Sequence, residues 1–209
     1  MTIRLYDFEL DENAYKVRLL LAFLGIAYEK VAMNVFPGTE HKSDAFLTLN
    51  PLGELPALED GAVTLYQPEA ILVYLARQYD PSGTWLPDEA GALAEVMQWL
   101  AFAAHQLRDA ATARRGALFG EAIDEEKTIA SVQNSFRILE TRLTHRFLLG
   151  KLWLATQTPS IADLAVFPAF ALSRDFGVDH GEFPALRRWG RALRNLPGFI
   201  PMPGVPDYH

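Results

Sequence analysis

The spacing of apolar residues changes near Glu89, and this change restricts the possible folds more than any other feature of the chain. Before Glu89, short segments with strand-like alternation take turns with segments at helical spacing. After it, strand alternation is absent and apolar residues recur every third or fourth position. Strands mixed with helices, followed by helices alone, predict an α/β unit joined to an all-α unit.

The first part of the chain predicts the order strand, helix, strand, loop, strand, strand, helix. Asp60 and Gly61 are a strong hairpin-turn signal, so we expect the last two strands to pair. Pro68 stands where a helix begins, because its missing N–H costs little in the first turn. The expected strands are residues 3–6, 27–33, 54–59 and 63–66, and the expected helices are residues 14–24, residues 45–48 and the segment after Pro68.

A segment rich in Pro, Gly and Ser separates the two patterns. Such a composition favours a linker over a helix or a strand. We therefore expect one domain over residues 1–80, a linker over residues 81–88 and an all-helical domain over residues 89–209.

The second part of the chain predicts helices and an extended tail. Ser160 and Asp163 have the spacing of a capping box, in which a hydroxyl and a carboxylate accept hydrogen bonds from first-turn amides. The proline-rich segment after Ile200 is expected to be extended. The expected helices are residues 90–113, with a break near Gly116 and Gly120, then residues 121–147, residues 164–172 and a last helix from Phe183.

Composition and charge exclude several classes of protein. The chain has no cysteine, which removes disulfides, thiolate metal ligands and a cysteine nucleophile. Its net charge is −7 and no basic stripe is visible, so we expect no nucleic-acid partner. No apolar run reaches the roughly 18 residues that span a bilayer, and no residues have the spacing of metal ligands. The first residues lack the sections of a signal peptide, so we expect a cytoplasmic protein without a membrane segment.

Four motifs resemble those of the glutathione S-transferase family, and they occur in the family's order over nearly the whole chain. The resemblance implies a thioredoxin-like α/β N-terminal domain, an all-α C-terminal domain and a homodimer. It also implies glutathione as co-substrate and a small-molecule electrophile as second substrate. The motifs are Leu-Asn-Pro-Leu-Gly-Glu-Leu-Pro at residues 49–56, Tyr-Gln-Pro-Glu-Ala-Ile at 66–71, Pro-Ser-Ile-Ala-Asp at 159–163 and Phe-Pro-Ala-Leu-Arg-Arg-Trp at 183–189.

By resemblance, the glutathione thiol lies beside the turn after the first strand, where a hydrogen-bond donor favours the thiolate. Bacterial and theta-like members carry a serine there, and this chain has Asp11. An ionised carboxylate cannot donate, and at about 4 Å it would repel a thiolate by roughly 4 kcal/mol. We therefore prefer a helix N-cap or a solvated loop acid as the role of Asp11, with catalysis as the alternative.

Asn13 is the better candidate for the thiol donor. Together with Lys16 it fits the Ser/Thr-x-Asn-x-x-Lys pattern of nu-class and yeast prion-related members, in which an asparagine amide approaches the thiol. The amide can donate without bringing a charge. Asparagine before a helix is also a common N-cap, so both interpretations of Asn13 stay open.

The resemblance also assigns the residues that hold the rest of glutathione. His41 and Lys42 match the stretch that binds the glycine carboxylate. Leu55 would offer its backbone to the cysteine part of the tripeptide, next to a cis bond to Pro56. Gln67 and Glu69 complete the expected glutathione-binding set.

The same region departs from the family at the start of the third helix. The family usually has Ser or Thr where this chain has Pro68, and that residue gives its hydroxyl and its N–H to the γ-glutamyl carboxylate. Two lost hydrogen bonds of about 1.5–3 kcal/mol each weaken binding by one or more orders of magnitude. Glu54, Glu69 and Asp11 add negative charge near an anionic ligand. We therefore predict a degenerate site, with weak or absent glutathione binding.

The expected electrophile pocket lies in the helical domain, at Trp99, Phe102, His105 and Arg114. Aromatic residues at helical spacing are also typical of a core, and arginines of a solvated face. The leading function is conjugation of glutathione to electrophiles, or reduction of disulfides with it. The alternative is a non-catalytic, dimeric binding protein on the same scaffold.

Overall fold

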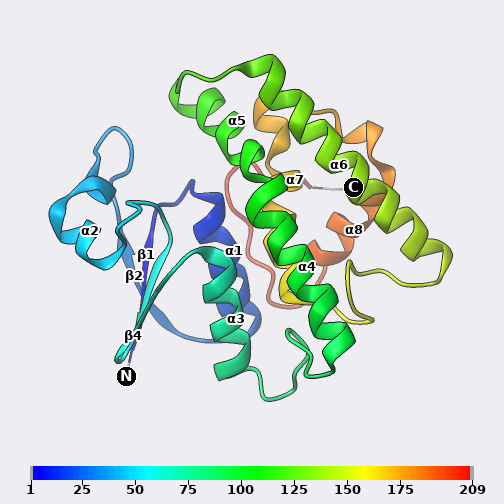
Figure 1. The fold of residues 1–209 in the computed structure, drawn as a ribbon, viewed down its shortest axis with the longest axis horizontal. Helices are drawn as coiled ribbons and strands as arrows, with labels where there is room; N and C mark the ends of the chain where they lie inside the picture. Colours follow the sequence, from blue (N-terminus) through cyan, green and yellow to red (C-terminus); the bar gives the residue numbers. More distant parts are fainter. Residues whose placement is uncertain (1, 208–209) are drawn as a thin grey trace.

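The computed structural model describes residues 2–207, which form a sheet half and a helical half (Figure 1). The elements of the sheet half are β1 (Ile3–Asp7), α1 (Glu12–Phe23), β2 (Tyr28–Ala32), η1 (Glu40–Lys42), α2 (Asp44–Leu49), β3 (Ala57–Asp60), β4 (Val63–Tyr66) and α3 (Pro68–Tyr79). The elements of the helical half are α4 (Ala90–Gln106), α5 (Arg108–Phe119), α6 (Glu125–Leu148), α7 (Ile161–Ala171), η2 (Ser173–Phe176), η3 (His180–Glu182) and α8 (Pro184–Arg194).

The sheet has the strand order β2-β1-β3-β4. β1 runs parallel to β2 and antiparallel to β3, and β3 and β4 form the hairpin predicted at Asp60 and Gly61. Residues of β1 alternate between buried and half-buried positions, as a strand with one fully covered face requires. α1 and α3 lie between the sheet and the helical half, and α2 lies on the opposite side of the sheet (Figure 1). The predicted thioredoxin-like half and all-α half are therefore confirmed.

α7 is the central helix of the core. Every residue of α7 is buried, so this helix is apolar on all sides rather than on one stripe. The predicted capping box begins it: Asp163 accepts from the backbone N–H of Ser160 at 2.9 Å and from its hydroxyl at 3.1 Å. The same carboxylate accepts from the Trp189 indole at 2.8 Å and from the Leu154 amide at 3.0 Å. One buried acid thus joins α7, α8 and the preceding loop.

The long helix expected over residues 90–113 is in fact two helices, α4 and α5. They separate at Leu107, which has φ −98° and ψ 4°. The Leu107 side chain is 3% exposed, so its burial in the core stabilises the break. The predicted break near Gly120 is confirmed, because α5 ends at Phe119 with Gly120 as its left-handed C-cap, whereas Gly116 is no break. Gly116 stays inside α5, where an added Cβ would lie 2.9 Å from Ile123. Its role is close packing rather than helix termination.

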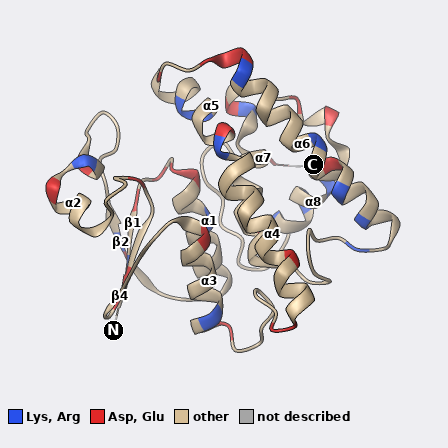
Figure 2. Cartoon of the chain, in the orientation of Figure 1, with Lys and Arg blue, Asp and Glu red and all other residues tan. Residues whose placement is uncertain are grey.

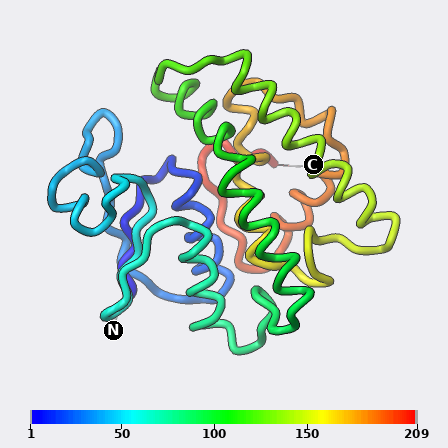
Figure 3. The backbone as a smooth tube through the Cα atoms, viewed as in Figure 1, coloured from blue at the N-terminus to red at the C-terminus, as the bar shows by residue number. Residues whose placement is uncertain are grey.

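The proline-rich tail runs along α1 (Figure 3) and is extended except at Pro203 and Gly204, where it turns and the Val205 amide donates to the Met202 carbonyl at 3.2 Å. The Tyr15 hydroxyl on α1 donates to the Ile200 carbonyl at 2.7 Å, and Met202 is buried. The tail therefore connects the sheet half with the helical half. Within residues 2–207, no helix combines the length and the apolar character that crossing a bilayer requires.

Candidate active site

The turn between β1 and α1, residues 8–11, ends in a helix cap. The Asp11 amide donates to the Phe8 carbonyl at 2.9 Å, which closes the turn. The Asp11 carboxylate accepts from the Ala14 amide at 2.6 Å, so Asp11 is the N-cap of α1. This confirms the N-cap interpretation of Asp11. An oxygen occupied in this way holds the first turn of α1 in place.

The environment of Asp11 changes its titration. The turn into α1 carries a run of acidic residues, visible in red in Figure 2. Burial raises the pKa of the Asp11 carboxyl to about 7, against the opposing effect of the Ala14 amide, and nearby Glu12 and Asp7 raise it further. Burial also raises the pKa of Glu12. At neutral pH the Asp11 carboxyl is therefore about half protonated, and a protonated carboxyl can donate a hydrogen bond.

Asn13 is the second residue of α1, so its interpretation as an N-cap is wrong: Asp11 holds that position. The Asn13 side chain has no hydrogen bond to another described residue. It lines a small pocket between the two halves of the molecule. A thiol donor must be neutral, must face a pocket and must have a free N–H group, and the Asn13 amide meets these three conditions.

The pocket itself is narrow, about 40 Å³. The sheet half contributes the β1–α1 turn and Val35, and the helical half contributes one face of α5. Phe119, at the end of α5, reduces the space: its ring lies 4.8 Å from that of Phe36, stacked, and 6.1 Å from that of Phe8. The lining residues are Phe8, Leu10, Asp11, Glu12, Asn13, Val35, Ala111, Arg114, Arg115, Leu118 and Phe119.

The backbone platform expected for glutathione is present. The Leu55–Pro56 peptide bond is cis, as the resemblance implied. β3 begins at Ala57, and its pairing with β1 begins there too. The backbone N–H and C=O of Leu55 therefore make no hydrogen bonds within the sheet. The Lys42 ammonium donates to the Gly53 carbonyl at 2.7 Å. Lys42 therefore stands close to the platform, with its charge uncompensated by a carboxylate among the described residues.

His41 lies next to Lys42 in η1, half-buried. Burial lowers the pKa of the His41 imidazole, and the charge of Lys42 lowers it further. The ring is therefore neutral at pH 7, since the ordinary histidine pKa is about 6.5. A neutral His41 can bind a carboxylate only as a hydrogen-bond donor, and Lys42 supplies the charge.

The start of α3 has the departure that the sequence predicted. Gln67 has φ 75°, a conformation that side-chain-bearing residues seldom adopt, and it precedes Pro68 at the first helical position. Pro68 offers neither a hydroxyl nor an N–H there. Glu69, however, is paired with Lys16: the ammonium lies 3.1 Å from the carboxylate, and the two side chains are 7% and 14% exposed. The charge of Glu69 is therefore compensated, which weakens the predicted electrostatic case against an anionic ligand.

The residues expected around the electrophile lie in two places. Trp99 is buried in the core, with the Phe102 ring at 5.3 Å and the Arg142 guanidinium 5.7 Å from its ring centre. His105 is exposed in the last turn of α4. None of these three lines the pocket between the halves, whereas Arg114 does, and it is buried rather than solvated.

The prediction from the sequence included Arg114 but not Ala111 or Leu118, which line the pocket from the same face of α5. Ala111, Arg114, Arg115 and Leu118 have the spacing i, i+3, i+4, i+7, so they share one helix face. This spacing was the available signal. It was hidden because the break at Leu107 had not been placed, and the face of α5 was therefore undefined.

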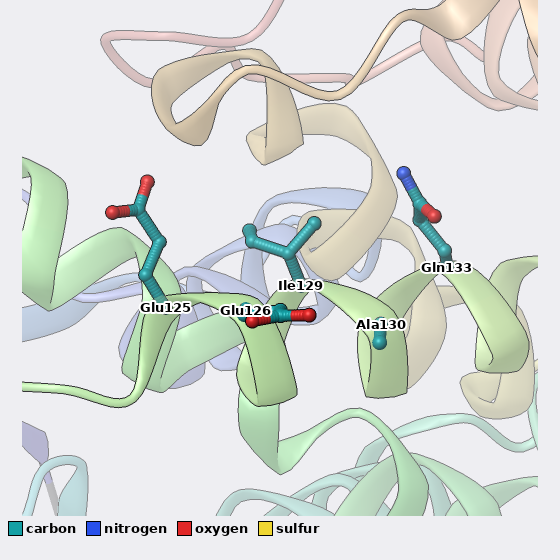
Figure 4. Close-up of a pocket in the computed structure, with 5 residues that line it drawn as sticks. All are labelled: Glu125, Glu126, Ile129, Ala130 and Gln133. Atoms are coloured by element: carbon teal, nitrogen blue, oxygen red, sulfur yellow. The ribbon is translucent and has the colours of Figure 1, made fainter.

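A second, more open hollow of about 630 Å³ lies on the outer side of α6 (Figure 4). Its lining residues all come from this one helix, and they combine acids with small or apolar side chains: Glu125, Glu126, Ile129, Ala130 and Gln133. A hollow with a single wall offers a ligand little enclosure. Over residues 2–207, no three His, Asp or Glu side chains are grouped in a way that could hold a metal ion.

The sheet order, the cis bond before Pro56 and the all-helical second half define a thioredoxin-like protein with an α-helical C-terminal half. The family model for the N-terminal domain of glutathione S-transferase matches residues 1–77, and that for the C-terminal domain matches residues 92–197. The chain belongs to the glutathione S-transferase family.

Individual relatives agree with this family. The chain is 30% identical to glutathione S-transferase F13 of Arabidopsis thaliana, over 98% of this chain and 97% of the relative. A glutathione S-transferase structure from Pseudomonas fluorescens superposes with TM-score 0.87 at 27% identity, covering 97% of this chain and all of the other. A glutathione transferase homolog from Lodderomyces elongisporus, solved with two GSH per subunit, superposes with TM-score 0.85 at 26% identity, covering 95% of each chain.

Proposed function

We propose that this chain binds glutathione and conjugates it to an electrophile or reduces a disulfide with it, with Asn13 as the donor that holds the thiolate. The observation that supports this most directly is the position of the Asn13 side chain, at the pocket and without a hydrogen-bond partner among the described residues. Asp11, the other candidate, is engaged with the Ala14 amide and is a second donor only in its protonated form.

The chemistry requires little of the protein beyond holding the sulfur. In conjugation, the thiol loses its proton to solvent, the sulfur forms a bond to an electrophilic carbon, and the leaving group departs with its electron pair. In disulfide reduction, the sulfur attacks one sulfur of the substrate and the other leaves as a thiolate. A second glutathione thiolate then releases the product and forms oxidised glutathione. In both cases a donor to the thiolate lowers the pKa of the thiol and raises the fraction that can react.

The remaining contacts of glutathione follow from the platform. In this proposal the Leu55 backbone next to Pro56 pairs with the cysteine part of the tripeptide, and Lys42 and His41 hold the glycine carboxylate. Gln67 faces the γ-glutamyl end, and Glu69, compensated by Lys16, stabilises the start of α3. The Lodderomyces elongisporus relative, solved with two GSH per subunit, supports glutathione as the ligand of this fold.

Pro68 favours a second candidate function, in which the chain is a non-catalytic binding protein that no longer binds glutathione. Its ring removes two donors at the start of α3, and the narrow pocket leaves little room for a second substrate. Isothermal calorimetry with glutathione at pH 7 separates the two candidates. An enzyme gives a saturable heat and conjugates a chloronitrobenzene, whereas a repurposed scaffold does neither and stays folded.

Two sets of variants test the assignment of the site. Asn13→Ala removes a hydrogen bond to a charged sulfur, worth about 1.5–3 kcal/mol, so kcat/KM should fall roughly tenfold to a hundredfold. Asn134→Ala, an exposed asparagine within α6, is the matched control. Unchanged conjugation by Asn13→Ala would remove Asn13 from the mechanism. Pro68→Ser combined with Asp11→Ser should raise glutathione affinity, and no gain would mean that the site is misassigned.

We further propose that the chain acts as a cytoplasmic homodimer, as is usual for the family. Half-exposed apolar side chains such as Tyr66 and Met97 support a contact with a second copy. Sedimentation equilibrium gives the mass directly, and a monomer at micromolar concentration would contradict the dimer.

A further inference from the structure

Two buried arginines hold the β1–α1 turn by its backbone. Arg18 of α1 donates to the Phe8 carbonyl at 3.3 Å and to the Glu9 carbonyl at 3.0 Å. Arg114 of α5 donates to the next carbonyl, that of Leu10. Three consecutive carbonyls are therefore fixed by guanidinium groups from the two halves of the molecule, immediately before Asp11 and Asn13.

Each of these arginines is itself fixed by a carboxylate. Arg18 pairs with Asp7, at the end of β1. Arg114 donates to Asp175 of η2 at 2.8 Å, and the two side chains are 4% and 19% exposed. A buried ion pair contributes little net stability compared with apolar packing of the same volume, because its charges lose their hydration. The two ion pairs instead fix the position of the β1–α1 turn relative to α5.

The C-terminal tail lies against Arg18 and against Asp175, the partner of Arg114. The sulfur of Met202 lies 4.0 Å from the Arg18 guanidinium. Gly204, with φ +96°, passes so close to Asp175 that an added Cβ would lie 2.9 Å from a carboxylate oxygen. The Ile200 carbonyl accepts from the Tyr15 hydroxyl, which fixes the start of this stretch against α1. We call residues 200–204 the C-terminal strap.

We propose that the C-terminal strap is a positioning device for the thiol donor: it holds Asp175 and Arg18 in place, and Asp175 and Arg114 in turn fix the turn that presents Asn13. This inference rests on the proposed function for its effect on catalysis. No residue of the strap lines the pocket, so the strap acts through the arginines and not on the substrate. Asp175, which does not line the pocket, is accordingly a positioning residue, and Arg114 both lines the pocket and positions the turn.

The sharpest test compares two glycine-to-alanine variants of the full chain. Gly204→Ala places a methyl group against Asp175, whereas Gly150→Ala, at φ +70°, meets no atom within 4 Å. Both carry the cost of a left-handed backbone, so they differ in the contacts of the added methyl group, with Asp175 and with Leu172 Cδ2 at 3.1 Å, and Asp175→Asn tests the Asp175 part alone. Hydrogen exchange of a peptide covering residues 8–14 should accelerate in Gly204→Ala and in Asp175→Asn, and should match the wild type in Gly150→Ala.

Catalysis gives the second readout. A small displacement of a reacting group can cost up to about a hundredfold in rate, so we expect kcat of Gly204→Ala and Arg114→Lys to fall roughly tenfold or more. The ultraviolet absorbance of the bound thiolate should titrate at higher pH in these variants, an effect that simple loss of stability does not produce.

Equal exchange in the two glycine variants overturns the inference, and so does faster exchange without a change in kcat or in the titration of the bound thiol. If the wild-type chain gives no heat with glutathione, the proposed function fails. The exchange experiment then still decides whether the strap holds the turn.

Discussion

The titration of Asp11 predicts that glutathione binding weakens as the pH rises through neutrality. Burial holds the pKa of the Asp11 carboxyl at about 7, far above its ordinary value of 3.8. The carboxyl is therefore neutral below pH 7 and charged above it. Next to a tripeptide of net negative charge the neutral form is the favourable one, because it can donate a hydrogen bond and does not repel the ligand.

The size of the effect follows from the fraction of neutral carboxyl. With a pKa of about 7, about nine tenths of the Asp11 carboxyls are neutral at pH 6 and about one tenth at pH 8. If the neutral form alone accepts the ligand, affinity falls about tenfold between these pH values, which is about 1.4 kcal/mol.

Isothermal calorimetry with S-methylglutathione measures this effect without interference from a titrating thiol. Asp11→Asn keeps a good N-cap for α1 and has no carboxyl to titrate, so its affinity should be the same at pH 6 and pH 8. Asp124→Asn, at the exposed N-cap of α6, should retain the wild-type pH dependence. A wild-type affinity that does not change with pH, or a tenfold change that persists in Asp11→Asn, would refute the reasoning.

Three further predictions concern stability and are measured by urea unfolding. Asp163→Asn places an NH2 group against the buried Ser160 amide and should lower the free energy of unfolding by about 2–4 kcal/mol. The control Asp124→Asn should lower it by under about 0.5 kcal/mol, and equal losses would contradict the role of the buried carboxylate. Lys16→Met leaves the Glu69 carboxylate without its partner and should lower the free energy of unfolding by about 3 kcal/mol. The double variant Lys16→Met, Glu69→Leu should regain most of this loss, and additive losses would exclude a coupled pair. Tyr15→Phe removes the hydrogen bond to the tail and should cost about 1 kcal/mol, so no loss would show that this bond contributes nothing.

The candidate site was only partly predictable from the sequence. The motif around residues 50–56 placed the cis bond before Pro56, and Asp11 was correctly interpreted as a cap. Arg114 was interpreted as a pocket residue with a solvated face as the alternative, but its burial was not foreseen. Its partners Leu10 and Asp175 lie 104 and 61 positions away, so no local pattern could reveal them.

The elements of secondary structure show the same division. Turn, proline and capping residues predicted the hairpin at Asp60 and Gly61, the helix start at Pro68 and the capping box at Ser160, and periodicity predicted the helices between them. It missed the break at Leu107, because helical spacing continues through this residue and no Gly or Pro marks the end. The break depends on the burial of Leu107 in a core formed by other helices.

The sequence alone determined the family, the order of strands and helices and the loss of donors at Pro68. These features depend on residue types and on spacings of two to four positions, so interactions between residues close in the sequence are enough to specify them. Only the tertiary structure decided that Lys16 neutralises Glu69, that α5 rather than α4 faces the pocket, and that the tail lies against Arg18 and Asp175. Whether a charge is buried and paired depends on groups that folding brings together from distant parts of the chain, and residue type alone does not specify it.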